Sequence, residues 1–100
     1  MAATRMQRGS GNVFRDLGFP PDEAAHLLIR TDLMIAIRRV LKARKLTQAR
    51  AAELLGTTQP RVSDLMRGRI DLFSIDALVD FLARLGVGVT VRTSPRKRVA

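Results

Sequence analysis

The segment from Leu46 to Gly68 reads LTQARAAELLGTTQPRVSDLMRG. It predicts two short helices joined by a tight turn. Thr47 can cap the first helix with its hydroxyl, and Gly56 suits the left-handed position that ends this helix. The second helix follows Thr58 and ends at the final glycine. Helices that cross steeply need a small residue where they approach each other, and Ala52 supplies it.

The outer face of the second helix is polar, because its apolar residues are needed for packing. Leu55, Val62 and Leu65 are expected to close the small core between the two helices. A helix with an outer face of hydrogen-bonding side chains is suited to the major groove of DNA. The outward residues are Gln59, Arg61, Ser63, Asp64 and Arg67.

Length and composition limit the class of protein. One hundred residues with an apolar fraction of 46% suit a single domain with a modest core. The absence of cysteine excludes disulfides and thiolate metal sites, and it suits a reducing cytoplasm. No apolar run approaches the ~20 residues of a membrane span, and the first ten residues lack a secretory signal. We therefore expect a soluble, cytoplasmic protein.

The net charge of +9 points to an anionic partner. No acid occurs from Leu33 to Ala52, although this stretch holds six lysines and arginines. Charge alone describes a solvated helix face equally well, and an anionic membrane surface would attract the same residues. The helical pattern described above favours nucleic acid.

The chain before this unit predicts a long helix. Residues 1–12 are expected to form a flexible basic arm, and an apolar segment from Val13 precedes Pro20 and Pro21. Prolines followed by acids are typical of a helix start. No glycine or proline interrupts residues 22–44, although Thr31 and Asp32 leave open a bend with a restarted helix. The predicted core face of this helix comprises Ile29, Leu33, Ile37 and Val40, and His26 is placed on the same side.

The chain after the unit predicts one more helix and a strand. Ser74 caps a helix that ends at Gly86, and Val87, Val89 and Val91 then alternate with other residues in the period of a strand. A single strand lacks partners for its backbone groups, so we expect it to pair with a second copy or with another protein. The alternative is an extended tail packed on the preceding helix. The predicted fold is mainly α, a compact domain of four to five helices over residues 13–92 with one C-terminal β-strand, followed by a basic tail over 93–100.

The chain resembles the Xre and Cro/repressor class of helix-turn-helix proteins over about residues 13–91. Within that class, the long leading helix, the stretch Asp71–Ser74 and the closing strand resemble HigA-like antitoxins. The resemblance implies a bacterial, nucleoid-associated homodimer that binds an inverted-repeat operator in double-stranded DNA and represses its own operon. An antitoxin would also neutralise a RelE/HigB-like ribonuclease toxin. The alternative is a stand-alone Xre-type repressor with no toxin partner.

The resemblance also implies roles for single residues. Gln48 matches a phosphate-holding position, and Gln59 matches a base-reading position whose amide can pair with adenine. Pro60 offers only apolar contact. The Asp64 carboxylate can accept a hydrogen bond from cytosine, or it can hold Arg61 or Arg67 in place. The base-reading set is Gln59, Pro60, Arg61 and Asp64, and the phosphate and positioning set is Thr47, Gln48, Thr58, Ser63, Arg67 and Arg69. From the residue pattern, Leu28 and Ile35 point away from the predicted core face of the long helix, and we expect the dimer or toxin contact to use them or the strand residues Val87, Val89 and Val91.

An enzymatic function has little support in the residue pattern. There is no cysteine nucleophile, no second histidine and no phosphate-binding glycine loop, and the adjacent acids Asp22 and Glu23 lie at a helix start. Four phenylalanines without tryptophan or tyrosine offer little stacking surface for single-stranded RNA. We expect a binding protein without a cofactor or a metal ion.

Overall fold

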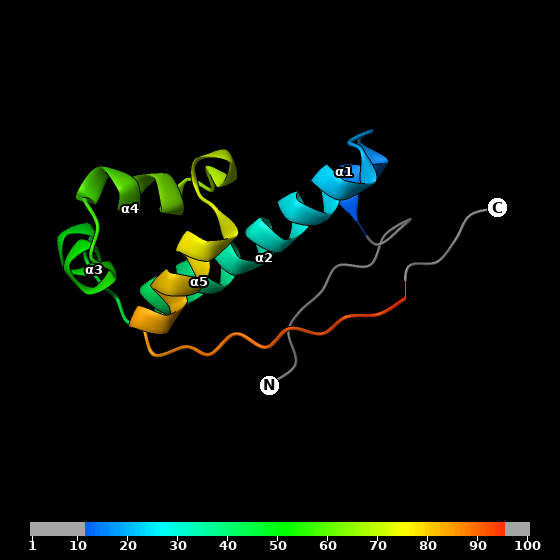
Figure 1. Ribbon diagram of the computed structural model, residues 1–100. Helices are drawn as coiled ribbons and strands as arrows, with labels where there is room; N and C mark the ends of the chain where they lie inside the picture. The colour runs from blue at the N-terminus through cyan, green and yellow to red at the C-terminus, as the bar shows by residue number, and fades with distance from the viewer. Residues whose placement is uncertain (1–11, 96–100) are drawn as a thin grey trace.

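The computed structural model describes residues 12–95, which form five α-helices and one 3-10 turn. These elements are α1 (Val13–Asp16), α2 (Pro21–Ala43), α3 (Gln48–Leu55), α4 (Gln59–Met66), η1 (Ile70–Leu72) and α5 (Ile75–Arg84). Helix α2 is the long axis of the molecule, with α1 at one end and α3 and α4 at the other (Figure 1). Helix α5 packs against α2. The mainly α prediction is confirmed, whereas most of the two predicted basic tails lies outside the described residues.

Helix α2 is a single unbroken helix of 23 residues. It begins with Pro21, and Asp22 and Glu23 lie in its first turn, where acids complement the positive end of the helix dipole. Thr31 does not cap a restarted helix. Its Oγ1 instead donates to the Leu27 carbonyl oxygen at 2.8 Å, one turn back along the same helix. Within residues 12–95, no helix combines the length and the apolarity that a bilayer crossing requires.

The buried face of α2 differs from the predicted one. Ile29 was expected in the core but is 46% exposed, and His26 is exposed as well. The reason is that the main core covers only the second half of α2, where α4 and α5 pack. The buried residues of α2 are Ala24, Met34, Ile37 and Leu41.

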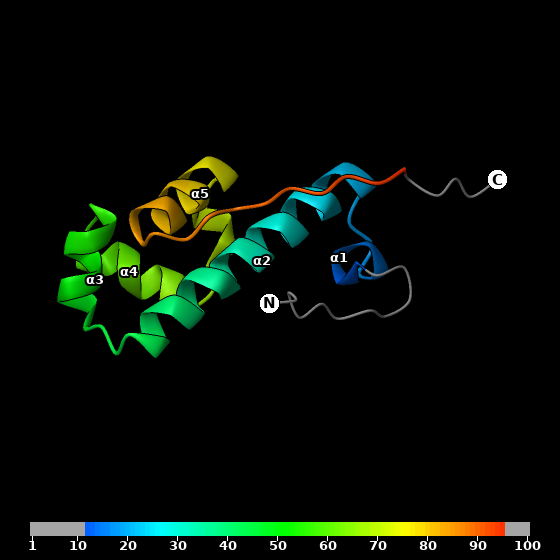
Figure 2. The same cartoon turned by 90° about the horizontal axis from the view of Figure 1, so that it is seen from below.

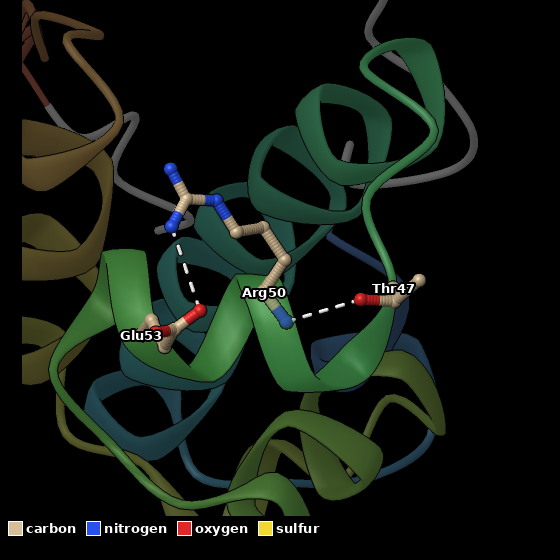
Figure 3. A network of polar contacts seen from close by, with 3 residues as sticks. All are labelled: Thr47, Arg50 and Glu53. Atoms are coloured by element: carbon tan, nitrogen blue, oxygen red, sulfur yellow. Dashed lines mark hydrogen bonds and ion pairs between the residues drawn. The ribbon is translucent and has the colours of Figure 1, made fainter.

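Helices α3 and α4 form the predicted helix-turn-helix unit with the predicted caps. The Thr47 hydroxyl oxygen accepts a hydrogen bond from the Arg50 backbone N–H at 3.1 Å (Figure 3). The Thr58 hydroxyl oxygen does the same for the Arg61 N–H at 3.3 Å. Gly56 closes α3 with a φ of 68°, a conformation that favours glycine. Residues next to the turn therefore determine where α3 ends and where α4 begins.

The core joins α2, α3, α4 and α5. Leu55, Val62 and Leu65 are buried as predicted, and the small Ala52 is buried where α3 meets its neighbours. Full burial of a side chain of this size contributes about 1.5–3 kcal/mol relative to exposure. Helix α5 begins at the Ser74 cap, and its buried residues are Leu78, Phe81 and Leu82.

The predicted C-terminal strand is not confirmed. Residues 87–95 leave α5 as an extended segment that runs back toward the end of the molecule where α1 lies (Figures 1 and 2). Val87 packs against the core, whereas Val91 is 79% exposed. A strand requires the N–H and C=O groups of a neighbouring strand, and residues 12–95 of one chain contain no second strand to supply them. The single chain thus has an extended tail, but beyond Val87 this tail is exposed and does not pack along α5 as the alternative expected.

Lys45 lies in the left-handed region with a φ of 52°, the one non-glycine residue of positive φ among residues 12–95. Such a conformation costs on the order of 1–3 kcal/mol in a non-glycine residue. We expect Lys45→Gly to raise the free energy of unfolding by about 1 kcal/mol in urea denaturation, because glycine removes this strain. The control is Lys42→Gly, at a position within α2, which should lower the free energy of unfolding by about 1 kcal/mol. A loss of stability in both variants would contradict the strain at Lys45.

Candidate nucleic-acid interface

The first turn of α4 presents Gln59 and Pro60 to solvent. Both residues precede the part of α4 that enters the core at Val62. The Thr58 cap accepts with its oxygen and keeps its hydroxyl hydrogen to donate elsewhere. The Gln59 amide therefore lies at the open end of a capped helix, the part of a recognition helix that contacts base edges.

Arg61 was predicted to read bases, but its guanidinium lies against the loop that follows α4. Its Cζ is 4.1 Å from the centroid of the Phe73 ring, and its Nη1 donates to the Leu72 carbonyl oxygen at 3.0 Å. The Phe73 side chain is itself buried in the core. The contact between Arg61 and Phe73 was missed because it joins residues that are distant in the sequence.

Ser63 and Asp64 are half-buried on α4. Asp64 does not hold Arg61 or Arg67 through an ion pair, which was one of the two roles predicted for it. Ion pairs elsewhere in the described part of the chain include Arg50–Glu53 at 3.4 Å, shown in Figure 3, and Arg84–Asp80 at 3.2 Å. Both pairs are exposed, so each contributes little to stability.

The start of α3 forms a basic surface with the end of α2. Thr47 and Gln48 are exposed, and both line a shallow pocket together with Lys42 and Lys45. Lysines beside the N-terminus of a helix suit a phosphate group. Neither lysine was predicted as a site residue, although both lie in the stretch without acids.

A second basic group surrounds Gly68, just after the C-terminal end of α4. Arg67 and Arg69 flank this glycine and are exposed. Arg38 reaches it from α2, because a Cβ atom on Gly68 would lie 3.7 Å from Arg38 Nη1. Arg38 is one of the six lysines and arginines between Leu33 and Ala52, and it was not predicted as a site residue. Two basic groups therefore lie at the two ends of the helix-turn-helix unit.

The predicted dimer or toxin contacts differ in exposure. Leu28 and Val87 are half-buried, whereas Val89 and Val91 are exposed. Ile35 is exposed, but it lies in a shallow depression of α2 whose other lining residues are cationic. These are Arg38, Arg39 and Lys42. The surroundings of Ile35 are thus less apolar than the sequence pattern suggested.

Comparison with known proteins agrees with this geometry. A family profile described as a helix-turn-helix domain matches residues 13–94, which include every helix described above. The chain belongs to the helix-turn-helix domain family. A solved structure whose name places it provisionally in the XRE family of transcriptional regulators is 34% identical, with a TM-score of 0.68. The match covers 78% of this chain and 90% of that one, and no curated protein matches significantly.

This helix-turn-helix protein is therefore of the XRE type, a class of DNA-binding regulators. In the helix-turn-helix arrangement, the second helix of the unit enters the major groove and the first crosses the backbone. Helix α4 occupies the position of that second helix, and α3 occupies the position of the first. Family membership favours a binding function over an enzymatic one.

Proposed function

We propose that this helix-turn-helix protein binds double-stranded DNA in a sequence-specific manner, with α4 in the major groove. One observation carries the proposal. Helix α4 is fixed in the core by Val62 and Leu65, whereas Gln59 and Pro60 remain exposed at its capped first turn. A helix held in this way can present hydrogen-bonding groups in a fixed register, as base recognition requires.

The basic groups at both ends of the unit supply phosphate contacts in this proposal. Thr47, Gln48 and the neighbouring lysines serve one end, and Arg67 and Arg69 serve the other. Thr58 and Ser63 support the recognition helix between them. Residues 33–95 hold eleven lysines and arginines against five acids, a surplus that favours the DNA backbone. As a homodimer, the protein would bind an inverted repeat with half-site centres about 34 Å apart and repress its own operon.

Selection from a library of random DNA duplexes tests this function. The full chain should enrich an inverted repeat, and a gel shift should show at least about 1,000-fold tighter binding to the enriched duplex than to a scrambled one. Size-exclusion chromatography with light scattering on the complex should give two chains per duplex. Equal affinity for the enriched and the scrambled duplex would refute sequence-specific binding.

Arg69→Ala should weaken binding to enriched and scrambled duplexes by the same factor, because an arginine beyond the end of α4 contacts phosphate rather than bases. The slope of log K against log salt concentration should fall in magnitude by about 0.9, the value for one lost phosphate contact. Gel shifts over a salt series measure this slope. Arg15→Ala is the matched control, since it removes the same charge from α1 at the opposite end of the molecule. An unchanged slope in Arg69→Ala would remove this residue from the interface.

A second part of the proposal is that the protein is an antitoxin of a RelE/HigB-like ribonuclease toxin. The supporting observation is the surface at the end of the molecule opposite α4. Residues 12–32 hold four acids against two arginines, although the whole chain carries a charge of +9. Four large apolar side chains are exposed there: Val13, Leu17, Phe19 and Ile29. An acidic and apolar surface suits a basic protein partner.

Co-expression with the adjacent reading frame, followed by affinity capture, tests the antitoxin function. We expect a stable complex with a small basic protein, and Leu17→Lys should weaken this complex while leaving DNA binding intact. Gln59→Ala should weaken DNA binding and leave the protein complex intact. If the adjacent product is not captured, the stand-alone repressor is the better description.

A further inference from the structure

Two arginines from different helices hold the turn η1 between α4 and α5. Arg30 Nη1 on α2 donates to the Ile70 carbonyl oxygen at 3.3 Å, and Arg61 Nη1 on α4 donates to the Leu72 carbonyl oxygen at 3.0 Å. A short 3-10 turn leaves carbonyl groups that need partners from outside it. Arg61 supplies this partner to the Leu72 carbonyl oxygen, and Arg30 adds a second donor to the Ile70 carbonyl oxygen, which also accepts from the Phe73 N–H at 3.4 Å.

The second contact of Arg61 connects it to α5. Its guanidinium lies over the ring of Phe73, which is 2% exposed, and this ring packs edge-on against Phe81 of α5 at a centroid distance of 6.1 Å. A guanidinium over an aromatic face is attracted by the ring quadrupole. If Arg61 swung out to a base edge, it would lose both this attraction and the hydrogen bond to Leu72.

The loop that Arg61 holds begins with the basic residues at the end of α4. Gly68 turns the chain with a φ of 75°, and the Arg69 backbone N–H donates to the Asp64 carbonyl oxygen at 3.1 Å. Arg69 directly precedes the turn η1, so the orientation of this turn limits where the Arg69 side chain can reach. Fixing the turn therefore fixes a phosphate-binding arginine.

We infer that Arg61 is a positioning residue for DNA recognition and does not read bases. Its hydrogen bond to Leu72 and its stacking on Phe73, together called the lock, hold η1 against α4 and so place Arg69 beside the recognition helix. Base reading then depends on Gln59 and Pro60 at the first turn. The inference rests on the proposed binding of DNA, but the lock itself is a property of the free protein.

The test compares Arg61→Ala, Phe73→Leu and the double variant in binding to the enriched and the scrambled duplex. Circular dichroism first establishes a temperature at which all variants are fully folded. Each single variant should bind both duplexes about tenfold more weakly, and the ratio of the two affinities should change by less than about twofold. The double variant should be about as weak as either single variant, because both break the same lock.

Phe73→Leu separates the two roles, because the buried ring cannot touch DNA and the charge of Arg61 is retained. A base-reading Arg61 predicts that Arg61→Ala weakens only the enriched duplex and that Phe73→Leu changes neither affinity. That result would overturn the inference. Gln59→Ala serves as the reference for base reading in the same assay.

Urea denaturation tests the lock without DNA. The shifts in the midpoint caused by Arg61→Ala and Phe73→Leu should be non-additive, whereas Arg61→Ala combined with Phe14→Leu, on the distant α1, should be additive. Additive shifts for the first pair would overturn the lock. A wild-type protein that binds both duplexes equally would contradict the proposed function, and the midpoints would still decide whether Arg61 holds the turn.

Discussion

Leu65→Ala is expected to lower the free energy of unfolding by about 2–5 kcal/mol. Leu65 is completely buried on α4, within the core that joins this helix to α2 and α5. Truncation removes apolar contacts and leaves a cavity that the surrounding helices fill only in part. Small domains have a total stability of about 5–15 kcal/mol, so this one change removes a large share of it. Urea denaturation followed by circular dichroism measures the effect.

Leu17→Ala is the matched control for this prediction. Leu17 is the same residue type, but it is 70% exposed at the end of α1. Its truncation should change the free energy of unfolding by no more than about 0.5 kcal/mol. Losses of equal size at the two positions would show that α4 is not anchored through Leu65.

Gln59→Ala should reduce affinity for the enriched duplex by about 1–3 kcal/mol and leave affinity for the scrambled duplex nearly unchanged. The physical reason is the position of the amide at the exposed first turn of α4, where it can form two hydrogen bonds to one base. The measurement is a pair of gel-shift titrations at one fixed salt concentration, since salt alone changes every affinity.

Gln48→Ala provides a control with the same chemical change. Gln48 is the first residue of α3, beside the lysines that line the basic pocket. A glutamine that contacts phosphate should weaken both duplexes equally when it is truncated. If Gln59→Ala behaved like Gln48→Ala, the assignment of α4 as the reading helix would be wrong.

Helix ends were predictable from the sequence, because the caps act over one or two turns. A threonine hydroxyl at position 47 or 58 accepts from an N–H three residues later, and Gly56 has only to adopt a local conformation. The serine cap of α5 follows the same rule at Ser74. The family resemblance was confirmed at the level of the XRE type, while the HigA-like subgroup stays a prediction.

Other features depend on contacts that the sequence does not display. Ile29 fits the apolar period of α2, yet it is exposed because the packed helices cover only the second half of α2. The alternating valines after Gly86 can form a strand only where a second strand supplies hydrogen-bond partners for their backbone groups. Arg61 fits an outward position on α4, but its long side chain folds back onto Phe73. In each case tertiary or quaternary surroundings determine the outcome.

The hydrogen bond from Arg30 to Ile70 makes the recognition element depend on the first half of α2. Arg30 lies in the first half of α2, toward α1, yet its guanidinium supports the turn beside the recognition helix. A minimal fragment that starts at Leu33 would keep the helix-turn-helix topology and lose this donor. The helix-turn-helix unit and the turn η1 therefore do not contain every residue that fixes them. If they were grafted onto another protein, that protein would have to supply an arginine in the place of Arg30.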